Sequence, residues 1–180
     1  SAFVAVLTDG THVGAYVCDG QTTAAWFTGA QQGEAIALTN DQGLRLSATL
    51  HQAADGLQLS RGTMHEPDGT EHDFAAERVP AHGRAGLYRA VVPAPVGHGA
   101  TDEPPTVGVI VLPSGAYRGA YYADETVTPV TDVRLGSSRL TAIVPGIGSV
   151  EATQVSTPAT TEVPRWPGPT TPHHLRVRAG

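Results

Sequence analysis

The chain has 180 residues, of which 40% are hydrophobic, and it contains 21 glycines and 14 prolines. Its 11 basic residues are all arginine and are outnumbered by 17 acidic residues, which gives a formal net charge of -6. Because binding of phosphates needs a clustered basic surface, this composition argues against nucleic acid as a partner. No apolar run approaches the roughly 20 residues of a membrane-spanning helix, and the frequent Gly and Pro breaks favour many short strands.

The opening stretch contains two Asp-Gly pairs, Asp9-Gly10 and Asp19-Gly20. Read as two-residue hairpin turns, they predict a three-stranded ribbon with Val6 opposite Val13 and Val13 opposite Trp26. Side chains alternate between the faces of a strand. One face of the ribbon is then predicted to carry Val4, Val6, Val13, Ala15, Val17 and Trp26, and the other Phe3, Ala5, Leu7, His12, Gly14, Tyr16, Cys18 and Phe27. Since both faces are apolar, we expect another sheet, the C-terminal tail or a partner protein to cover the second face.

The only cysteine, Cys18, ends the second predicted strand of this ribbon. It has no second cysteine for an internal disulfide and no Cys-x-x-Cys motif for redox or zinc chemistry. His12, on the same strand, is six residues or about 20 Å away and cannot act as its base. We therefore interpret Cys18 as a buried or edge thiol that packs as a small apolar residue.

Further turn signals recur every 8–12 residues or so and separate short alternating runs such as LRLSATLH, GLYRAVVP and TVGVIVLP. This pattern is typical of an all-β protein, an antiparallel barrel or sandwich of hairpin-linked strands. The sequence predicts one all-β domain over residues 1–156, with the loop 94–105 as the point where the strands could divide into two groups. Residues 157–180 are rich in Pro and Thr and are predicted to form an extended tail.

The segment Met64–Asp73, MHEPDGTEHD, is the best metal candidate, since its Pro-Asp-Gly turn brings two strands with histidines close together. His65 and His72 form a cross-strand pair of the kind that can hold zinc or copper. Pro67 excludes the helical geometry of an H-E-x-x-H protease. Charged hairpin tips are usually solvated surface features, so we predict no resident metal and no cofactor.

Aromatic side chains are the other candidates for a binding role. The run AYRGAYYA places Tyr117 and Tyr121 on one side of a strand and Arg118 and Tyr122 on the other. A docking face is predicted from one set of aromatic residues: Phe3, Tyr16, Phe27, Tyr121, Tyr122 and Trp166. The sequence has no nucleophile elbow, phosphate loop, dinucleotide fingerprint or EF-hand, and it assigns no catalytic residue.

The series FVAVLTDGTHVGAYVCDG, WFTG, LRLSATL, GLYRA and VGVIVLPSGAYRGA resembles a loosely defined group of exported actinobacterial proteins. The resemblance covers about Phe3 to Ser156 and implies an extracytoplasmic β domain, secreted or in the cell envelope. It implies no catalytic residue. No signal segment opens the sequence, so we expect any export signal or anchor to lie upstream, and membrane association to be indirect, through that anchor or a partner.

Together these observations favour a non-catalytic, extracytoplasmic protein-interaction module, an accessory or structural subunit of a larger assembly or filament. Its partner would be another protein or copies of itself, with the apolar second face and the Pro-rich tail as docking elements. The alternative is a small-ligand-binding or hydrolytic barrel in which Trp26, Tyr88 or Tyr121 faces an interior cavity.

Overall fold

A computed structural model of the chain describes residues 2–52, 58–79, 83–93, 104–124 and 126–155. Within these residues the protein is all-β, with antiparallel strands in three sheets and no helix, as the sequence predicts. The described residues consequently include no helix that could cross a membrane.

Two sheets make up the first half of the described chain. The N-terminal sheet contains β1 (Phe3–Thr8), β2 (His12–Cys18) and β3 (Ala24–Ala30), in that order. The middle sheet contains β4 (Ala35–Thr39), β5 (Arg45–Gln52), β6 (Gln58–His65) and β7 (Glu71–Glu77), also in chain order.

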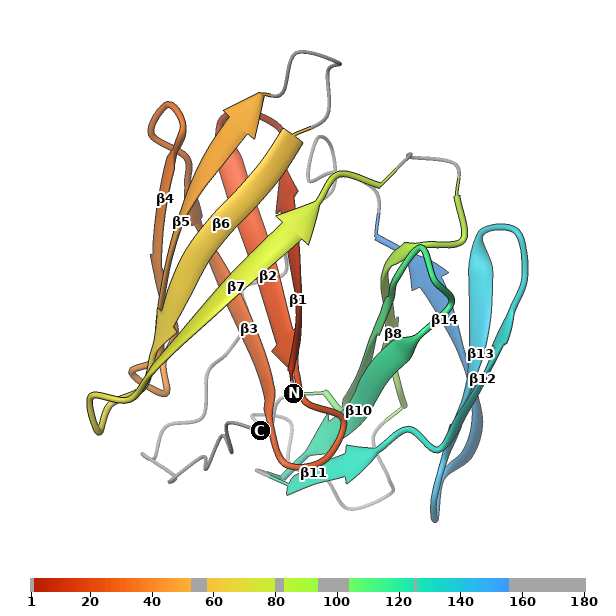
Figure 1. Ribbon diagram of the computed structural model, residues 1–180. Helices are drawn as coiled ribbons and strands as arrows, with labels where there is room; N and C mark the ends of the chain where they lie inside the picture. Colours follow the sequence, from red (N-terminus) through yellow and green to blue (C-terminus); the bar gives the residue numbers. More distant parts are fainter. Residues whose placement is uncertain (1, 53–57, 80–82, 94–103, 125, 156–180) are drawn as a thin grey trace.

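The C-terminal sheet has seven strands in the order β11-β10-β9-β8-β14-β13-β12. They are β8 (Gly86–Val91), β9 (Thr106–Val111), β10 (Tyr117–Ala123), β11 (Thr126–Pro129), β12 (Asp132–Leu135), β13 (Arg139–Val144) and β14 (Gly148–Gln154). Its two end strands, β11 and β12, follow each other in the chain with only Val130 and Thr131 between them. The sheet therefore curls, which Figure 1 shows as β8 and β10 facing β12 and β13.

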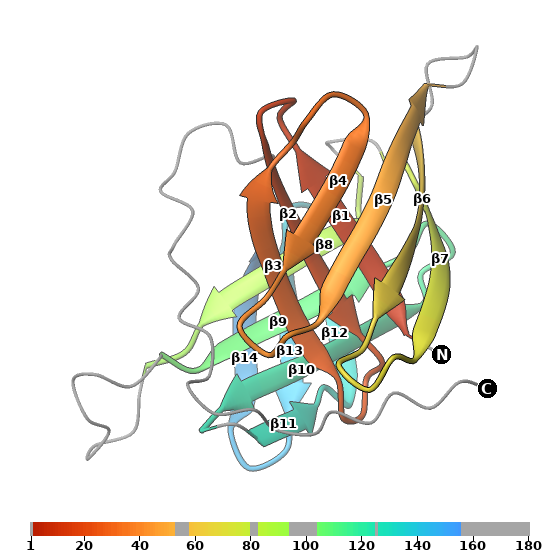
Figure 2. The same ribbon diagram turned by 90° about the vertical axis from the view of Figure 1, so that its left-hand side faces the viewer.

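The N-terminal sheet is the central layer of the molecule. The middle sheet covers one of its faces, and the C-terminal sheet, whose strands cross it steeply, covers the other (Figure 2). Both faces of the first ribbon are buried, as its composition predicts, and the cover on both sides belongs to this same chain.

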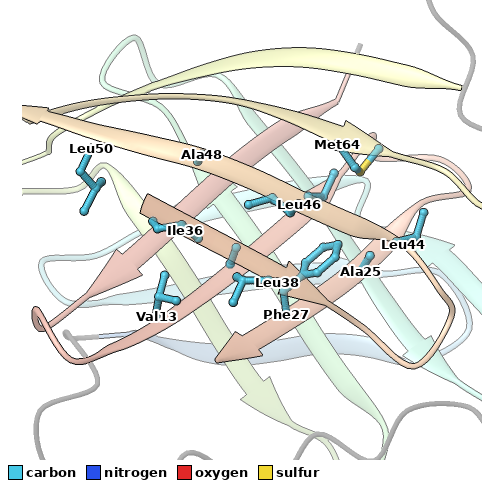
Figure 3. Close-up of a cluster of buried hydrophobic side chains, with 12 residues drawn as sticks. Val13, Ala25, Phe27, Ile36, Leu38, Leu44, Leu46, Ala48, Leu50 and Met64 are labelled. Carbon is cyan, nitrogen blue, oxygen red and sulfur yellow. The ribbon is translucent and has the colours of Figure 1, made fainter. Parts of the chain in front are cut away.

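The first core lies between the N-terminal and middle sheets (Figure 3). Alternate residues of β2 and β3 meet alternate residues of β4 and β5, as expected for two half-buried sheets. Its buried side chains are Val13, Ala15, Val17, Ala25, Phe27, Ile36, Leu38, Leu44, Leu46, Ala48, Leu50 and Met64. Burial of an aliphatic or aromatic side chain of this size contributes about 1.5–3 kcal/mol, so this core is a main source of stability.

Two further cores involve the C-terminal sheet. The face of the N-terminal sheet that is turned away from the first core packs on the C-terminal sheet. The buried residues of this contact are Tyr16, Cys18 and Ala24 from the N-terminal sheet and Leu87, Ile110 and Ala120 from the C-terminal sheet. The inner side of the curl holds Tyr88, Val107, Val109, Val111, Tyr121, Val130, Leu140, Ala142, Val144 and Ala152. The uninterrupted apolar run of β9 is explained by this arrangement, because β9 is buried on both faces.

The register within the first ribbon differs from the prediction. Val6 pairs with Ala15, because Asp9 bonds across the turn to His12 and the turn is centred on Gly10 and Thr11. This shift of two residues in pairing leaves every β1 and β2 side chain on its predicted face.

The second turn has a larger effect on the faces. Asp19 bonds across it to Thr23, which leaves a three-residue loop where two residues were predicted. Tyr16 now pairs with Trp26. The prediction paired Val13 with Trp26, so the register differs by three residues. The predicted faces of Trp26 and Phe27 are therefore wrong and must be exchanged, since a shift by an odd number of residues turns every side chain over.

The loop 94–105 does not separate two groups of strands. β8 and β9, on its two sides, pair with each other inside the C-terminal sheet. The change from one sheet to the next occurs between β7 and β8 instead. The predicted tail, residues 157–180, lies outside the described residues.

Candidate interaction surfaces

Most of the aromatic residues predicted to form a docking face are not on the surface. Tyr16 is 1% exposed, Phe27 2% and Tyr121 7%, and they belong to three different cores. Side chains that the chain itself buries cannot contact a partner, so the prediction is wrong for these three. Phe3 and Tyr122 are partly buried, and Trp166 lies outside the described residues.

Tyr16 and Trp26 form the centre of the contact between the N-terminal and C-terminal sheets. Their ring centroids are 4.0 Å apart, and the Tyr16 hydroxyl donates a hydrogen bond to the Gly108 carbonyl oxygen on β9 at 3.4 Å. The Arg89 guanidinium on β8 lies 5.8 Å from the Trp26 ring centroid, within cation–π range. This aromatic pair fixes the position of one sheet on the other.

A second arginine–aromatic contact lies between the same two sheets. The Arg118 guanidinium lies 4.9 Å from the Phe3 ring centroid, and its Nη1 donates to the Tyr117 carbonyl oxygen at 3.0 Å. Phe3 is thus covered by an arginine of the same chain. The predicted alternation in β10 is confirmed, since Arg118 faces the N-terminal sheet while Tyr117 and Tyr121 pack in the curl.

Cys18 is fully buried and not disulfide-bonded. Burial raises the pKa of its thiol to about 11, although the Gly20 N–H, 3.3 Å from Sγ, acts in the opposite direction. A thiol that stays protonated is a poor nucleophile and a poor metal ligand. The interpretation of Cys18 as a buried packing residue is confirmed.

The acidic residue after Cys18 shapes the loop to β3. Asp19 Oδ1 accepts hydrogen bonds from the backbone N–H groups of Gln21, Thr22 and Thr23 at 2.8–2.9 Å. Partial burial of Asp19 would raise its pKa, but these donors stabilise the carboxylate and the net shift is downward. Asp19 therefore has a structural role as the residue that organises this turn.

The His65 and His72 pair does not come together. His65 pairs with Glu71 and Met64 pairs with His72, so the two histidines occupy opposite faces of the β6–β7 hairpin. His65 Nδ1 lies 3.1 Å from Glu71 Oε1 on the outer face. The described residues contain no group of three or more His, Cys, Asp or Glu side chains arranged to hold a metal ion. The candidate metal pair is therefore wrong.

On the inner face of the same hairpin, His72 Nε2 lies 2.8 Å from Glu66 Oε1. Glu66 is only 5% exposed and lies on the Met64 side of the hairpin, facing the first core. This buried pair of His72 and Glu66 was not predicted, because the predicted pair, His65 and His72, was chosen by closeness across the turn. Counting alternate positions from the Pro-Asp-Gly turn would have placed Glu66, Met64 and His72 on one face.

The sequence prediction also missed a strand edge at β12 that no other strand of the described residues covers. β12 is the last strand of the C-terminal sheet and is paired with β13 on one side. The Gly136 N–H bonds to the Arg139 carbonyl oxygen, so by alternation the N–H groups of Val133 and Leu135 point away from β13. Asp132 Oδ1 accepts the Val133 N–H at 2.9 Å and thereby covers part of this edge.

No protein-family model matches the chain, and no curated protein or solved structure matches it. The resemblance to exported actinobacterial proteins therefore stays a prediction.

Proposed function

We propose that the chain is a non-catalytic, extracytoplasmic protein-binding module, an accessory or structural subunit that docks on another protein through the open β12 edge. The observation that carries this proposal is that the seven-stranded sheet ends at β12, which among the described residues is paired with a strand on one side alone. A strand edge with outward N–H and C=O groups binds an extended segment of a partner by continuing the sheet. The proposed location rests on the sequence resemblance.

The side chains at this edge suit such a contact. Val133 and Leu135 are partly buried against the core of the curl, and Arg134 between them is exposed. On the inner face, apolar side chains of an added strand would continue the surface formed by Val133 and Leu135. On the outer face, its side chains would lie beside the positive charge of Arg134. Asp132 would give up the Val133 N–H to the incoming carbonyl oxygen, so the same residue limits unspecific pairing of the edge.

The polar groups elsewhere support a binding role over a catalytic one. Asp9, Asp19 and Asn40 each use Oδ1 to accept backbone N–H groups of their own turns. His65 and His72 each bond a glutamate on opposite faces of one hairpin. Such groups stabilise local structure, whereas an active site needs them to converge on a reacting atom.

A photoreactive amino acid at position 134 tests the proposal in the full chain, with envelope and cytosolic extracts of the source organism as separate inputs. The matched control carries the same amino acid at Asp41, which is exposed in the β4–β5 turn. We expect one discrete protein adduct from position 134 in the envelope extract and none from position 41. Adducts of equal yield from both positions, or no adduct from position 134, would refute docking at β12, and an adduct only in cytosol would refute the location.

A further inference from the structure

The side chains of β12 alternate between apolar and charged along its open edge. Val133 and Leu135 are partly buried against the core of the curl. Asp132 and Arg134 are exposed, and alternation places them together on the outer face. No other strand of the described residues pairs with this edge, and Figure 1 shows the β12–β13 hairpin on the side of the molecule away from the N-terminal and middle sheets. The chemistry of an added strand can therefore be argued residue by residue.

A second copy of β12 can add to this edge in only a few ways. A two-fold axis perpendicular to the sheet makes the two strands antiparallel and keeps both inner faces on the same side. Residues with outward N–H groups, which are Val133 and Leu135, then lie opposite residues of the same kind. The axis must therefore pass through one residue position of β12.

The charges on the outer face distinguish between these positions. With the axis at Arg134, the two guanidinium groups lie directly opposite each other, and with the axis at Asp132, the two carboxylates do. Like charges directly opposite each other are destabilising in a sheet. With the axis at Leu135, Arg134 lies opposite Gly136, which carries no charge. Only the axis at Val133 places Asp132 opposite Arg134 of the second copy, and it does so twice.

The backbone of β12 suits the same register. The Val133 N–H points away from β13 and is bonded by Asp132 Oδ1 at 2.9 Å. On the axis, each Val133 N–H donates to the Val133 carbonyl oxygen of the other copy, which forms one closely spaced bonded pair. Asp132 then loses this N–H and gains the guanidinium of Arg134 from the other copy. The carboxylate and the N–H thus both keep a partner when the strands join.

The surroundings of Arg134 favour a carboxylate from outside the sheet. Arg134 pairs in register with Thr141 on β13, which carries no charge. Thr141 in turn pairs with Glu151 on β14, and this carboxylate lies 3.4 Å from the Arg139 guanidinium. The row of β13 and β14 residues beside Arg134 therefore directs its one carboxylate to another arginine.

We propose that the protein docking at the β12 edge is a second copy of this chain, added antiparallel with Val133 on the two-fold axis. Asp132 and Arg134 of each copy pair with Arg134 and Asp132 of the other, and the two Val133 side chains meet on the inner face. This inference rests on the proposed function, because it names the partner at that edge. Both copies use the same edge, so assembly through β12 ends at a dimer. A strand of four residues makes a small contact, so the dimer is weak.

Sedimentation velocity of the purified full chain at low salt tests this contact, at concentrations up to about 1 mM because small interfaces are weak. We expect a monomer–dimer equilibrium without larger species. Arg134→Asp places carboxylates opposite each other, and Asp132→Arg places arginines opposite each other. Each variant alone should therefore dimerise at least about tenfold more weakly. The matched control, Arg45→Asp on the exposed face of β5, removes the same charge from another sheet and should leave the equilibrium unchanged.

An equal mixture of the two variants tests the register itself. The two arginines of the Asp132→Arg chain lie opposite the two carboxylates of the Arg134→Asp chain, so the mixture should dimerise about as well as the unmodified chain. An unmodified chain that stays monomeric up to about 1 mM would overturn the proposal. So would an Arg134→Asp variant that dimerises normally, or a mixture that stays monomeric.

Photo-crosslinking at position 134 separates this inference from the proposed function. A chain that is monomeric when purified but forms an adduct with a different protein in the envelope extract would overturn the second copy and leave the proposed function standing. A chain that is monomeric and forms no adduct would overturn both.

Discussion

Replacement of Gly108 by alanine tests the packing between the N-terminal and C-terminal sheets. A Cβ atom at this position would lie 2.6 Å from Tyr16 Cζ and 2.8 Å from Trp26 Cζ2. Carbon atoms in contact lie about 3.5–4.0 Å apart, so the rings or β9 would have to move by roughly 1 Å. Tyr16 is 1% exposed, so its ring is enclosed by the protein and cannot turn out into solvent. The two sheets must then separate locally.

The expected cost follows from two opposing effects. Overpacking of a buried site costs about 1–3 kcal/mol, and replacing glycine in a strand recovers about 0.5–1 kcal/mol through the lower entropy of the unfolded chain. We expect a net loss of about 1–2 kcal/mol in the free energy of unfolding. In a domain of this size that loss lowers the melting temperature by about 2–8 °C.

Urea unfolding, followed by tryptophan fluorescence, measures the effect. The control is Gly14→Ala on β2, which lies on the same face of that strand as Tyr16. The nearest atom to the added Cβ there is the Phe27 carbonyl oxygen at 3.7 Å. This is an ordinary contact distance, and we expect little destabilisation there. If Gly108→Ala shifts the midpoint no more than Gly14→Ala, the close approach of β9 to Tyr16 and Trp26 is refuted.

Three further predictions concern polar groups and the thiol. Asp19→Asn keeps the oxygen that accepts the turn N–H groups but loses the negative charge, so it should lower the free energy of unfolding at neutral pH. Because folding lowers the pKa of Asp19, the difference in unfolding free energy between variant and unmodified chain should vanish as the pH falls through the folded-state pKa. A difference that stays constant in acid would contradict this. Cys18 should resist alkylation at pH 8 in the native protein and react on unfolding, because burial raises its pKa to about 11; rapid native labelling followed by mass spectrometry would refute its burial. His72→Ala leaves the buried Glu66 carboxylate without this partner and should cost about 1–3 kcal/mol in urea unfolding, whereas His65→Ala breaks an exposed pair and should cost about 0–1 kcal/mol; equal costs would show that Glu66 does not depend on His72.

The strands themselves could be predicted from the sequence wherever alternation and turn residues agree. The apolar residues of β1 and β2 fall on the predicted faces because the shift at the first turn is an even number of residues. The alternation in β10 likewise sends Tyr117 and Tyr121 to one side. These are local properties, since the side-chain period of a strand does not depend on what covers it.

The position of Trp26 and Phe27 could not be predicted by the same reasoning. The Asp-Gly pair indicates a turn, but the length of the loop depends on how many N–H groups Asp19 Oδ1 can accept. Three donors stabilise a three-residue loop, and one additional residue exchanges the two faces of β3. The donors are backbone N–H groups, which every residue except proline carries, so the residue types after the Asp-Gly pair do not reveal the longer loop.

The candidate sites depended even more on the tertiary structure. His65 and His72 are close in sequence on either side of a tight turn, yet the register separates them and joins each to a glutamate. The predicted docking face was wrong for Tyr16, Phe27 and Tyr121. Their apolar surroundings predict that they are buried, but not whether the same chain or a partner buries them.

The amino-acid sequence alone determined that this chain folds into short antiparallel strands and that its first ribbon needs contacts on both sides. Those properties arise from turn chemistry and from the apolar content of neighbouring strands, which act within a few residues. The tertiary structure decided that two other sheets of the same chain supply the contacts, and that β12 is an end strand of its sheet within the described residues. Sheet order is set by the burial of surfaces that are distant in sequence, so no local pattern could reveal which strands would lie at an edge.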